Sequence, residues 1–323
     1  MNKDQEAIGV DFKTYQPGNE EDIVTLWNHV LHEDPIQPQR FRNLVLLDAN
    51  FDPTGMQLAW DGPQLVGCLY AVRRRLPMIA DDLEPDHGWI PFFFVRPAYS
   101  GQGVATQLLQ KALMFLRGCG RKRVFFASYA PNFIVPGIDR IAYPSGAGFL
   151  EANGFAVQYT ASAMDLCLVG FRSPDDVARH VEERHEEGYS FRLAQTKDLY
   201  PTIQLANEHF NPDWGRAIRE GVLRNLPPDH ISIAERSGEI LGFAMFGGYE
   251  GVPDRFGPFG VRADQRGKQL GKILLCHCLE NMKAKGVHSA WFLWTGETSP
   301  AGHLYKRVGF QVTRRFDVMV KDL

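Results

Sequence analysis

The feature that most restricts the fold of this chain is a loop pattern that occurs twice. One occurrence, FGVRADQRGKQLGKILL at residues 259–275, reads as an apolar strand, a polar loop with Gly267 and Gly271, and a helix. Apolar residues recur in that helix at helical spacing, so one of its faces is predicted to be buried. A glycine-containing loop that leads into a helix presents unpaired backbone N–H groups at the positive end of the helix dipole. The pattern therefore predicts a site for an anion such as pyrophosphate.

The same pattern lies upstream, in FFFVRPAYSGQGVATQLLQKAL at residues 92–113. A second pair of similar stretches follows the two loops: SGAGFLEANGF at residues 145–155 and PAGHLYKRVGF at residues 300–310. A repeat with so long a period predicts two fused domains rather than a solenoid. The first copy is longer between its two anchors. The extra residues are expected in the proline-rich stretch 131–144, which is not predicted to be helical.

Both loops resemble the acyl-CoA loop of the GNAT N-acetyltransferase superfamily, which is written [QR]-x-x-G-x-[GA]. In the second copy Arg266 and Gly271 fit this pattern, whereas Gln269 stands where the middle glycine is expected. The first copy meets the glycine positions and departs from the pattern at its first position, where Ser100 stands. The resemblance covers nearly the whole chain and implies two tandem GNAT domains.

The expected fold class is α/β, with a mixed sheet in each domain, because strands and helices alternate in the same order in both copies. We expect an N-terminal GNAT domain at residues 1–172 and a C-terminal GNAT domain at residues 189–323. Residues 173–188 are predicted to form a charged linker helix that starts at Ser173 and Pro174 and stops at Gly188.

Length and composition limit the remaining possibilities. The 323 residues, of which 44% are hydrophobic, suit two domains with real cores. A net charge of −3 gives no electrostatic reason to expect a nucleic acid or an anionic membrane as a partner. The N-terminal stretch has no apolar leader segment, and five scattered cysteines are typical of reduced thiols. We therefore expect a cytoplasmic protein that is a monomer or a homodimer.

The resemblance implies that acetyl-CoA is the acyl donor and that no metal is needed. It assigns donor binding to one set of residues in each copy: Phe94, Val95, Ser100, Gly101, Gln102, Gly103, Val104, Ala105 and Thr106 in the first, and Phe259, Gly260, Val261, Arg266, Gly267, Lys268, Gln269, Leu270, Gly271 and Lys272 in the second. Backbone amides of residues 259–261 would polarise the thioester carbonyl. Lys268, Lys272 and Lys306 are expected as point charges near the phosphates. Gln269 is tolerable there if its φ is negative.

Tyr305 is the predicted general acid. It lies in a match to the superfamily pattern A-x-x-[LF]-Y-x-x-x-G-F, where a tyrosine commonly sits beside the CoA sulfur, and a phenol within reach can protonate a departing thiolate. The equivalent residue of the first copy is Leu150, which cannot donate a proton, unless Tyr143 or Asp139 of the insert takes that role. The second copy is therefore expected to be the active one. A packing role for Tyr305 remains the alternative.

The general base is harder to predict. Glu250 precedes the second loop strand and is the chosen candidate, with Asp254 and Glu297 also open. Glu84 and His87 occupy the corresponding approach in the first copy. The neighbouring Cys276, His277 and Cys278 point in different directions on a helix and cannot close a tetrahedral metal site.

The predicted function is transfer of an acetyl group from acetyl-CoA to a primary amine, by direct attack in a ternary complex. Two alternatives remain open at this point. The chain could bind or sense CoA without turnover, because both loops depart from the pattern, or it could use an aminoacyl-tRNA donor. The acceptor, a small molecule or a peptide amine, is not identified by the sequence, because acceptor pockets in this superfamily are built from variable loops.

Overall fold

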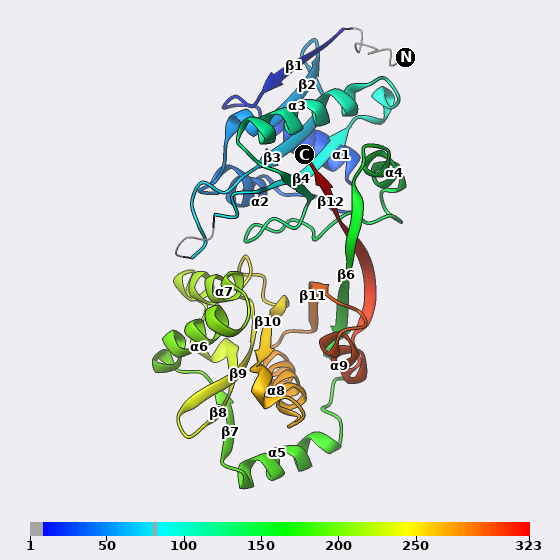
Figure 1. Cartoon of the computed structure of the whole chain (residues 1–323). Helices are drawn as coiled ribbons and strands as arrows, with labels where there is room; N and C mark the ends of the chain where they lie inside the picture. Colours follow the sequence, from blue (N-terminus) through cyan, green and yellow to red (C-terminus); the bar gives the residue numbers. More distant parts are fainter. Residues whose placement is uncertain (1–8, 80–82) are drawn as a thin grey trace. The chain divides into compact units, whose positions relative to one another are not determined.

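The computed structural model describes residues 9–79 and 83–323. Contacts divide the chain into two compact units. Unit 1 comprises the described part of Met1–Thr160 together with Phe316–Leu323, and unit 2 comprises Ala161–Arg315. Each unit is a mixed arrangement of strands and helices, as the sequence predicts (Figure 1).

Unit 1 is built on a sheet with the strand order β1-β2-β3-β4-β5-β12. Neighbouring strands are antiparallel except β4 and β5, which are parallel. The elements are β1 (Val10–Thr14), α1 (Glu20–Val30), α2 (Pro38–Phe41), a π-helical turn (Arg42–Leu46), β2 (Met56–Asp61), β3 (Gln64–Val72), β4 (His87–Val95), α3 (Val104–Gly118), β5 (Arg123–Phe126), α4 (Pro144–Ala152) and β12 (Gln311–Asp322).

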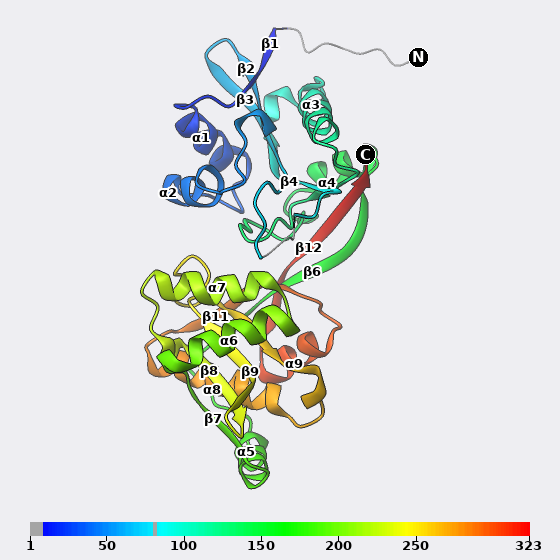
Figure 2. The same ribbon diagram turned by 60° about the vertical axis from the view of Figure 1, so that its left-hand side comes forward.

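Two hydrophobic cores lie on the two faces of this sheet. Successive side chains of a strand point to opposite faces, and the strands follow this alternation closely. Cys68 and Tyr70 of β3 belong to the core beneath α1 and α2, whereas Leu69 and Ala71 belong to the core beneath α3. Figure 2 shows α1 and α2 on one side of β2–β4 and α3 on the other. The near-continuous apolar sequence of β3 is explained by burial on both faces.

Unit 2 repeats this plan. Its antiparallel sheet has the order β10-β9-β8-β7, and β11 pairs with β6. Helix α8 contributes to the core on one face, and α6 and α7 contribute to the core on the other. The elements are β6 (Ala156–Cys167), α5 (Asp176–Glu186), β7 (Tyr189–Leu193), α6 (Thr196–His209), α7 (Pro212–Leu223), β8 (Ile231–Arg236), β9 (Glu239–Phe246), β10 (Phe256–Val261), α8 (Leu270–Ala284), β11 (Ser289–Thr295) and α9 (Pro300–Val308).

A helix is present in the expected stretch, as α5, and it belongs to unit 2. It stops before Gly188, which has a φ of +85°, as the sequence predicts. It starts later than expected, because Ser173 does not cap it. Instead the backbone N–H and the hydroxyl of Ser173 both donate to Glu280 of α8, each at 3.1 Å. None of the helices in the described ranges is both long and apolar enough to cross a membrane.

The two sequence copies exchange strands at their ends. β12 lies at the end of the second copy, yet its residues 319–322 pair with β5 in unit 1. β6 lies at the end of the first copy, yet its residues 162–167 pair with β11 in unit 2. Boundaries at residues 172 and 189 therefore describe the sequence repeat, whereas the compact units divide within β6 and β12. Each sheet is completed by a strand from the other copy.

The exchanged strand should be essential to unit 1. Phe316 is 1% exposed and belongs to the eight C-terminal residues that complete this unit. Replacing a buried phenylalanine with alanine leaves a cavity and costs about 3–5 kcal/mol. We expect Phe316→Ala to lower the urea midpoint and to speed hydrogen exchange of the β5 amides.

Thr313 is exposed on the same strand and provides the matched control. Thr313→Ala should change the free energy of unfolding by less than about 0.5 kcal/mol. Unchanged protection of β5 in Phe316→Ala would show that unit 1 does not depend on the exchanged strand.

Candidate functional site

A gap in the sheet of unit 1 opens where β4 parts from β5. The parallel pairing of the two strands ends at Ile90 and Phe126. The next residue, Pro91, has no N–H to donate. A bulge at this point gives β4 one residue more than β3 between two successive pairs. Beyond the bulge β4 stays paired with β3 only, so its other edge borders open space.

Backbone N–H groups of β4 face this gap. The N–H of Arg96 donates to the carbonyl of Val66, next to β3, over 2.8 Å. Because N–H groups of alternate residues point to the same side of a strand, those of Val95 and Phe93 point away from β3. Val95, expected from the sequence to contact the donor, therefore turns its backbone N–H toward the gap. Phe94 instead directs its backbone toward β3 and its side chain toward Trp27, with ring centroids 5.4 Å apart.

The glycine loop of the first copy follows β4 directly and forms the start of α3. Gly101 and Gly103 have φ values of +75° and +83°, the left-handed region that glycine adopts without strain. A side chain at Gly101 would meet no atom within 4 Å, so the space in front of the loop is open. The N–H groups of Val104, Ala105 and Thr106 lie in the first helical turn and have no intrahelical acceptors. The loop therefore fits a pyrophosphate.

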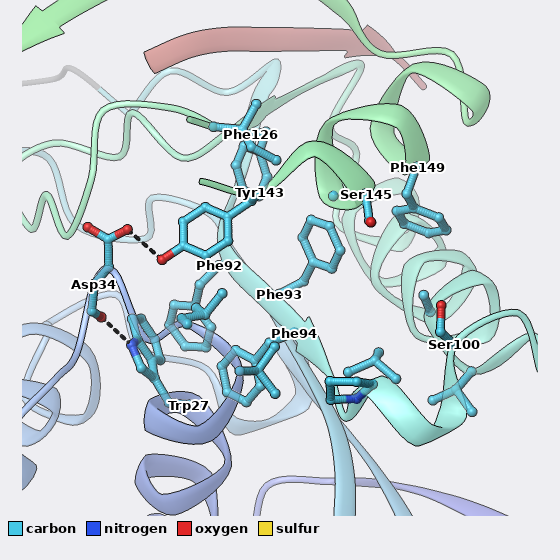
Figure 3. Close-up of a pocket in the computed structure, with 18 of the residues that line it drawn as sticks. Trp27, Asp34, Phe92, Phe93, Phe94, Ser100, Phe126, Tyr143, Ser145 and Phe149 are labelled. Carbon is cyan, nitrogen blue, oxygen red and sulfur yellow. Dashed lines mark hydrogen bonds between the residues drawn. The ribbon is translucent and has the colours of Figure 1, made fainter. Parts of the chain in front are cut away.

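A cavity of about 850 Å³ connects this loop to the opposite side of unit 1. Its walls include Pro91 to Val95 of β4, residues 100, 101 and 103–106 of the loop region, and Phe126 of β5. Figure 3 shows Ser100, Ser145 and Phe149 at one end and Trp27, Asp34 and Tyr143 at the other, with Phe93 and Phe94 between them. The cavity thus extends from the anion loop, past the unpaired edge of β4, to a second end of different chemistry.

An acidic side chain and a tyrosine meet at the second end. The hydroxyl of Tyr143 donates to Asp34 Oδ2 over 2.8 Å, and the indole N–H of Trp27 donates to the carbonyl oxygen of Asp34 over 2.8 Å (Figure 3). Tyr143 lies just before α4, and Leu150 within α4 is 1% exposed. Asp139 also lines the cavity, but its carboxylate accepts the N–H groups of residues 141 and 142 and so closes a turn. Of the two alternatives to Leu150 as proton donor, Tyr143 therefore presents a hydroxyl at this end of the cavity, whereas the Asp139 carboxylate is used in a turn.

The second glycine loop has the same backbone conformation as the first but different side chains. Gln269 is the residue before α8 and has a φ of +61°, in the left-handed region. The condition under which a glutamine is tolerable here, a negative φ, is therefore not met. The turn from loop to helix imposes the same backbone on Gln269 as on Gly103, whose φ is +83°. Gly267 is also left-handed, with a φ of +84° and open space around it. A residue with a Cβ at this conformation costs about 1–2 kcal/mol.

The lysines of the second copy are held by other side chains. Lys272 Nζ donates to both oxygens of Asp176 in α5 at 2.6 Å. Lys268 Nζ donates to the hydroxyl of Tyr189 at 2.7 Å and to Gln265 at 2.9 Å. Lys306 Nζ lies 2.7 Å from Glu297. A phosphate would have to compete with these partners.

Tyr305 lies inside an aromatic core. Its ring centroid is 4.5 Å from that of Phe292 and 5.4 Å from that of Phe310, and burial raises the pKa of its hydroxyl above the ordinary value.

Gly260, on the neighbouring strand, is in close contact with another element. A side chain there would come within 2.7 Å of the Phe210 ring and 2.9 Å of the Trp214 ring. Packing is therefore a sufficient reason for glycine at 260.

The candidate bases of the second copy have charged or polar partners. Glu250, with a φ of +58°, accepts from Arg255 Nη1 at 2.9 Å. Asp254 accepts from the hydroxyl of Ser289 at 3.1 Å. Hydrogen bonds from Arg315 and then Lys306 lower the pKa of Glu297 to about 2. Because a neighbouring cation stabilises the ionised carboxylate, it also makes that carboxylate a weaker base. The role of Glu250 stays a prediction.

The candidate bases of the first copy are paired in the same way. Glu84 accepts from Arg74 Nε at 2.6 Å and lies 3.3 Å from the ring of His87. Sequence reasoning missed Asp34 and Trp27. Neither residue belongs to a recognisable motif, because the loop that carries Asp34 follows α1 far from either glycine loop.

The fold and the site together define a class of protein. The chain has two strand–loop–helix units, each with a bulged strand and a glycine loop. In unit 1 a cavity joins the loop to the point where two strands separate. This is the arrangement of a tandem acyltransferase. Residues 22–135 match the model of the acetyltransferase (GNAT) family, and residues 227–312 match that of a GNAT acetyltransferase domain. These matches cover more than half of the chain. The chain belongs to the GNAT family and is a two-domain N-acetyltransferase.

Known proteins resemble the chain over its whole length. A curated relative from Thermobispora bispora, mycothiol acetyltransferase, is 24% identical over 91% of this chain and 93% of its own length. The glucosamine N-acetyltransferase region of a fungal multi-domain β-N-acetylglucosaminidase superposes with a TM-score of 0.78 at 17% identity, over 97% of this chain and 38% of that chain. A tandem GNAT protein from the clavulanic acid biosynthesis pathway gives 0.63 at 17% identity, over 97% of this chain and 98% of that chain. Likeness at this identity shows a shared fold.

The backbone of Gln269 generates a stability prediction. Glycine removes the left-handed strain of about 1–2 kcal/mol but adds roughly 0.5–1 kcal/mol of unfolded-state entropy. We expect Gln269→Gly to raise the free energy of unfolding by about 0.5–1 kcal/mol in urea titrations. The matched change, Gly103→Ala, should lower it by about 1 kcal/mol. A destabilised Gln269→Gly protein would mean that the glutamine side chain outweighs the strain.

Proposed function

We propose that this protein transfers the acetyl group of acetyl-CoA to a primary amine by direct attack in a ternary complex, and that unit 1 carries the reaction. The observation that supports this most is the cavity of unit 1. It joins an open glycine loop, the unpaired edge of β4 and a polar end with Asp34 and Tyr143. The reaction needs a site for an anion, backbone amides that bind the carbonyl oxygen, and a proton donor. One cavity offers candidates for all three.

The donor fits the loop end of this cavity. Residues 100–106 would hold the pyrophosphate through backbone N–H groups and the positive end of the α3 dipole. Lys111 of α3 also lines the cavity and adds a positive charge on this helix. The backbone N–H groups of Val95 and Phe93 would donate hydrogen bonds to the thioester carbonyl oxygen and stabilise the negative charge that develops on it.

Tyr143 is the proposed proton donor. The neutral amine nitrogen forms a bond to the carbonyl carbon, and the carbon–sulfur bond breaks. The sulfur gains a proton from the Tyr143 hydroxyl, and the nitrogen loses one, which restores the tyrosine through water. Protons therefore balance without a covalent enzyme intermediate. A phenol hydroxyl within hydrogen-bond reach can give a proton to a departing thiolate.

A role of unit 2 in catalysis remains a separate prediction. Tyr305, Glu250 and the second loop would have to act there with a hydroxyl inside an aromatic core and with lysines that are already paired. These contacts favour unit 1, although the sequence alone favours the second copy. The second copy of the repeat is needed for unit 1 in any case, since it supplies residues 316–323 of this unit.

Two matched tyrosine variants test the proposal. We expect Tyr143→Phe to lower kcat about 10²- to 10⁴-fold, the usual size of a general-acid contribution, with little change in the KM for acetyl-CoA. Tyr305→Phe should keep kcat within about twofold. The measurement is release of free thiol from acetyl-CoA with a primary amine present, followed with a thiol reagent.

The reverse pattern would assign catalysis to unit 2 and restore the role that the sequence gives to Tyr305. Thermal melting of each variant serves as the control for folding. Absence of thiol release with every amine tested, from a protein that binds acetyl-CoA, would contradict the acetyltransfer proposal and favour a protein that binds the donor without turnover.

Exchanging the residue before each helix tests which loop binds the donor. Gly103→Gln gives the first loop the residue of the second, and Gln269→Gly gives the second loop the residue of the first. Calorimetric titration of acetyl-CoA should show about one site in the original protein, a markedly weaker site in Gly103→Gln because of backbone strain, and an unchanged site in Gln269→Gly. Weaker binding only when residue 269 changes would place the donor in unit 2.

A further inference from the structure

The strand that the second copy supplies to unit 1 also reaches the cavity of this unit. Phe316 of β12 is 1% exposed and lines the cavity. The proline-rich insert of the first copy, residues 131–144, lines it as well, through residues 134, 135, 137–139, 142 and 143. Residues of both sequence copies therefore form the wall of one cavity.

The insert lies directly against β12 at the residue that follows Phe316. The N–H of Ile138 donates to the carbonyl oxygen of Asp317 over 2.9 Å, and the N–H of Asp317 donates to the carbonyl oxygen of Ile138 over 2.8 Å. A side chain at Gly137 would come within 2.3 Å of the same Asp317 oxygen. The two backbones are thus in close contact where the cavity wall changes from one copy to the other.

The side chain of Asp317 adds a second connection. It is 13% exposed and accepts hydrogen bonds from Arg140 Nε and, at 2.8 Å, from the Thr160 hydroxyl. Arg140 Nη2 also donates to Glu151 Oε1 of α4 at 2.7 Å. We call Asp317, Arg140 and Glu151 the clamp. Because hydrogen bonds between a guanidinium and a carboxylate are strong and directional, the clamp ties the insert to β12 and to α4.

The clamp lies within three residues of the proposed proton donor. The N–H of Tyr143 donates to the carbonyl oxygen of Asp139 over 2.8 Å, and the Asp139 carboxylate accepts the N–H groups of residues 141 and 142. Residues 139–143 therefore form one tight turn, and Arg140 is part of it. Tyr143 is also the residue directly before α4. A shift of Arg140 would move the backbone that carries the Tyr143 hydroxyl.

We propose that Asp317 is a positioning residue for acetyl transfer in unit 1. Through Arg140 it holds the turn at residues 139–143, so that the Tyr143 hydroxyl stays within reach of the departing thiolate. The proposal rests on the proposed function and gives the second copy a direct part in it. The effect on rate is expected to be large, because a misplacement of about 1 Å can lower a rate about 100-fold.

Asp317→Asn tests this role in the full-length protein. Asparagine has nearly the same shape and can still accept from Thr160, but it lacks the charge that binds Arg140. We expect kcat for thiol release from acetyl-CoA to fall about 10- to 100-fold. The KM for acetyl-CoA should stay unchanged, because residues 100–106 would hold the donor. Asp317→Glu keeps the charge and should recover part of kcat.

Double variants show through which residues Asp317 acts. Arg140→Gln should lower kcat as much as Asp317→Asn does, and the double variant should be no worse than either single one, because both changes remove the same contact. In Tyr143→Phe, the further change Asp317→Asn should alter kcat by less than about twofold, since no hydroxyl remains to be positioned.

Hydrogen exchange provides a readout that needs no turnover. In Asp317→Asn the amides of peptides from residues 131–144 should exchange about 3- to 10-fold faster, because the insert opens more often once the clamp is weakened. Peptides from β4 should exchange as in the original protein. Mass spectrometry after digestion measures both.

Asp322→Asn is the matched control. Asp322 lies on the same strand and accepts from Arg123 Nε of β5 at 2.9 Å, and neither residue lines the cavity. This variant loses an ion pair of the same kind but should keep kcat and the exchange of the insert unchanged. Thermal melting shows whether each variant is folded.

The remaining outcomes contradict the proposal in different ways. Unchanged kcat in a folded Asp317→Asn protein, or losses that add to those of Tyr143→Phe, would overturn the positioning role while leaving acetyl transfer intact. Faster exchange throughout unit 1 together with a raised KM for acetyl-CoA would mean that Asp317 only stabilises the fold. Absence of thiol release from the original protein would overturn the proposed function, and insert exchange that is unchanged in Asp317→Asn would separately overturn the clamp.

Discussion

The separation of β4 from β5 is the constraint on which the site depends. A parallel strand pair normally continues until one strand ends, but here Pro91 cannot donate to the ladder, and a bulge shifts the register of β4 against β3. The backbone beyond Ile90 therefore keeps one hydrogen-bonded neighbour and offers its other edge to a ligand. The glycine loop and α3 follow within a few residues, so this loop lies directly beside the open edge.

Duplication has given the chain two copies of this device, and the copies have diverged in their side chains. The second copy repeats the bulge, in β10, and the left-handed residue before the helix. It places a glutamine where glycine fits better, and it pairs its loop lysines with Asp176 and Tyr189. The exchange of β6 and β12 makes each sheet incomplete without a strand from the other copy. Each sheet is thus built from residues of both copies.

Local sequence patterns were enough to predict most of the helices and strands. Helical periodicity, the glycine positions and the turn at Ser237 and Gly238, which have φ values of +53° and +82°, led to the right elements in both copies. The pattern marked Gln269 as a departure from the expected glycine but did not give its backbone conformation, which the loop geometry fixes at a φ of +61°. It also gave no sign of the Asp34–Tyr143 hydrogen bond, whose partners are 109 residues apart in the sequence.

The sequence by itself determined the family, the two copies and the positions of the two glycine loops, because these depend on short-range spacing. Only the tertiary structure decided which strand completes each sheet and what lies opposite each loop. Strand pairing uses backbone groups that are common to all residues, so the side chains of β12 do not identify its partner strand. The wall of a cavity likewise comes from segments that are distant in the chain, and here α1, β4 and the insert before α4 line the same cavity.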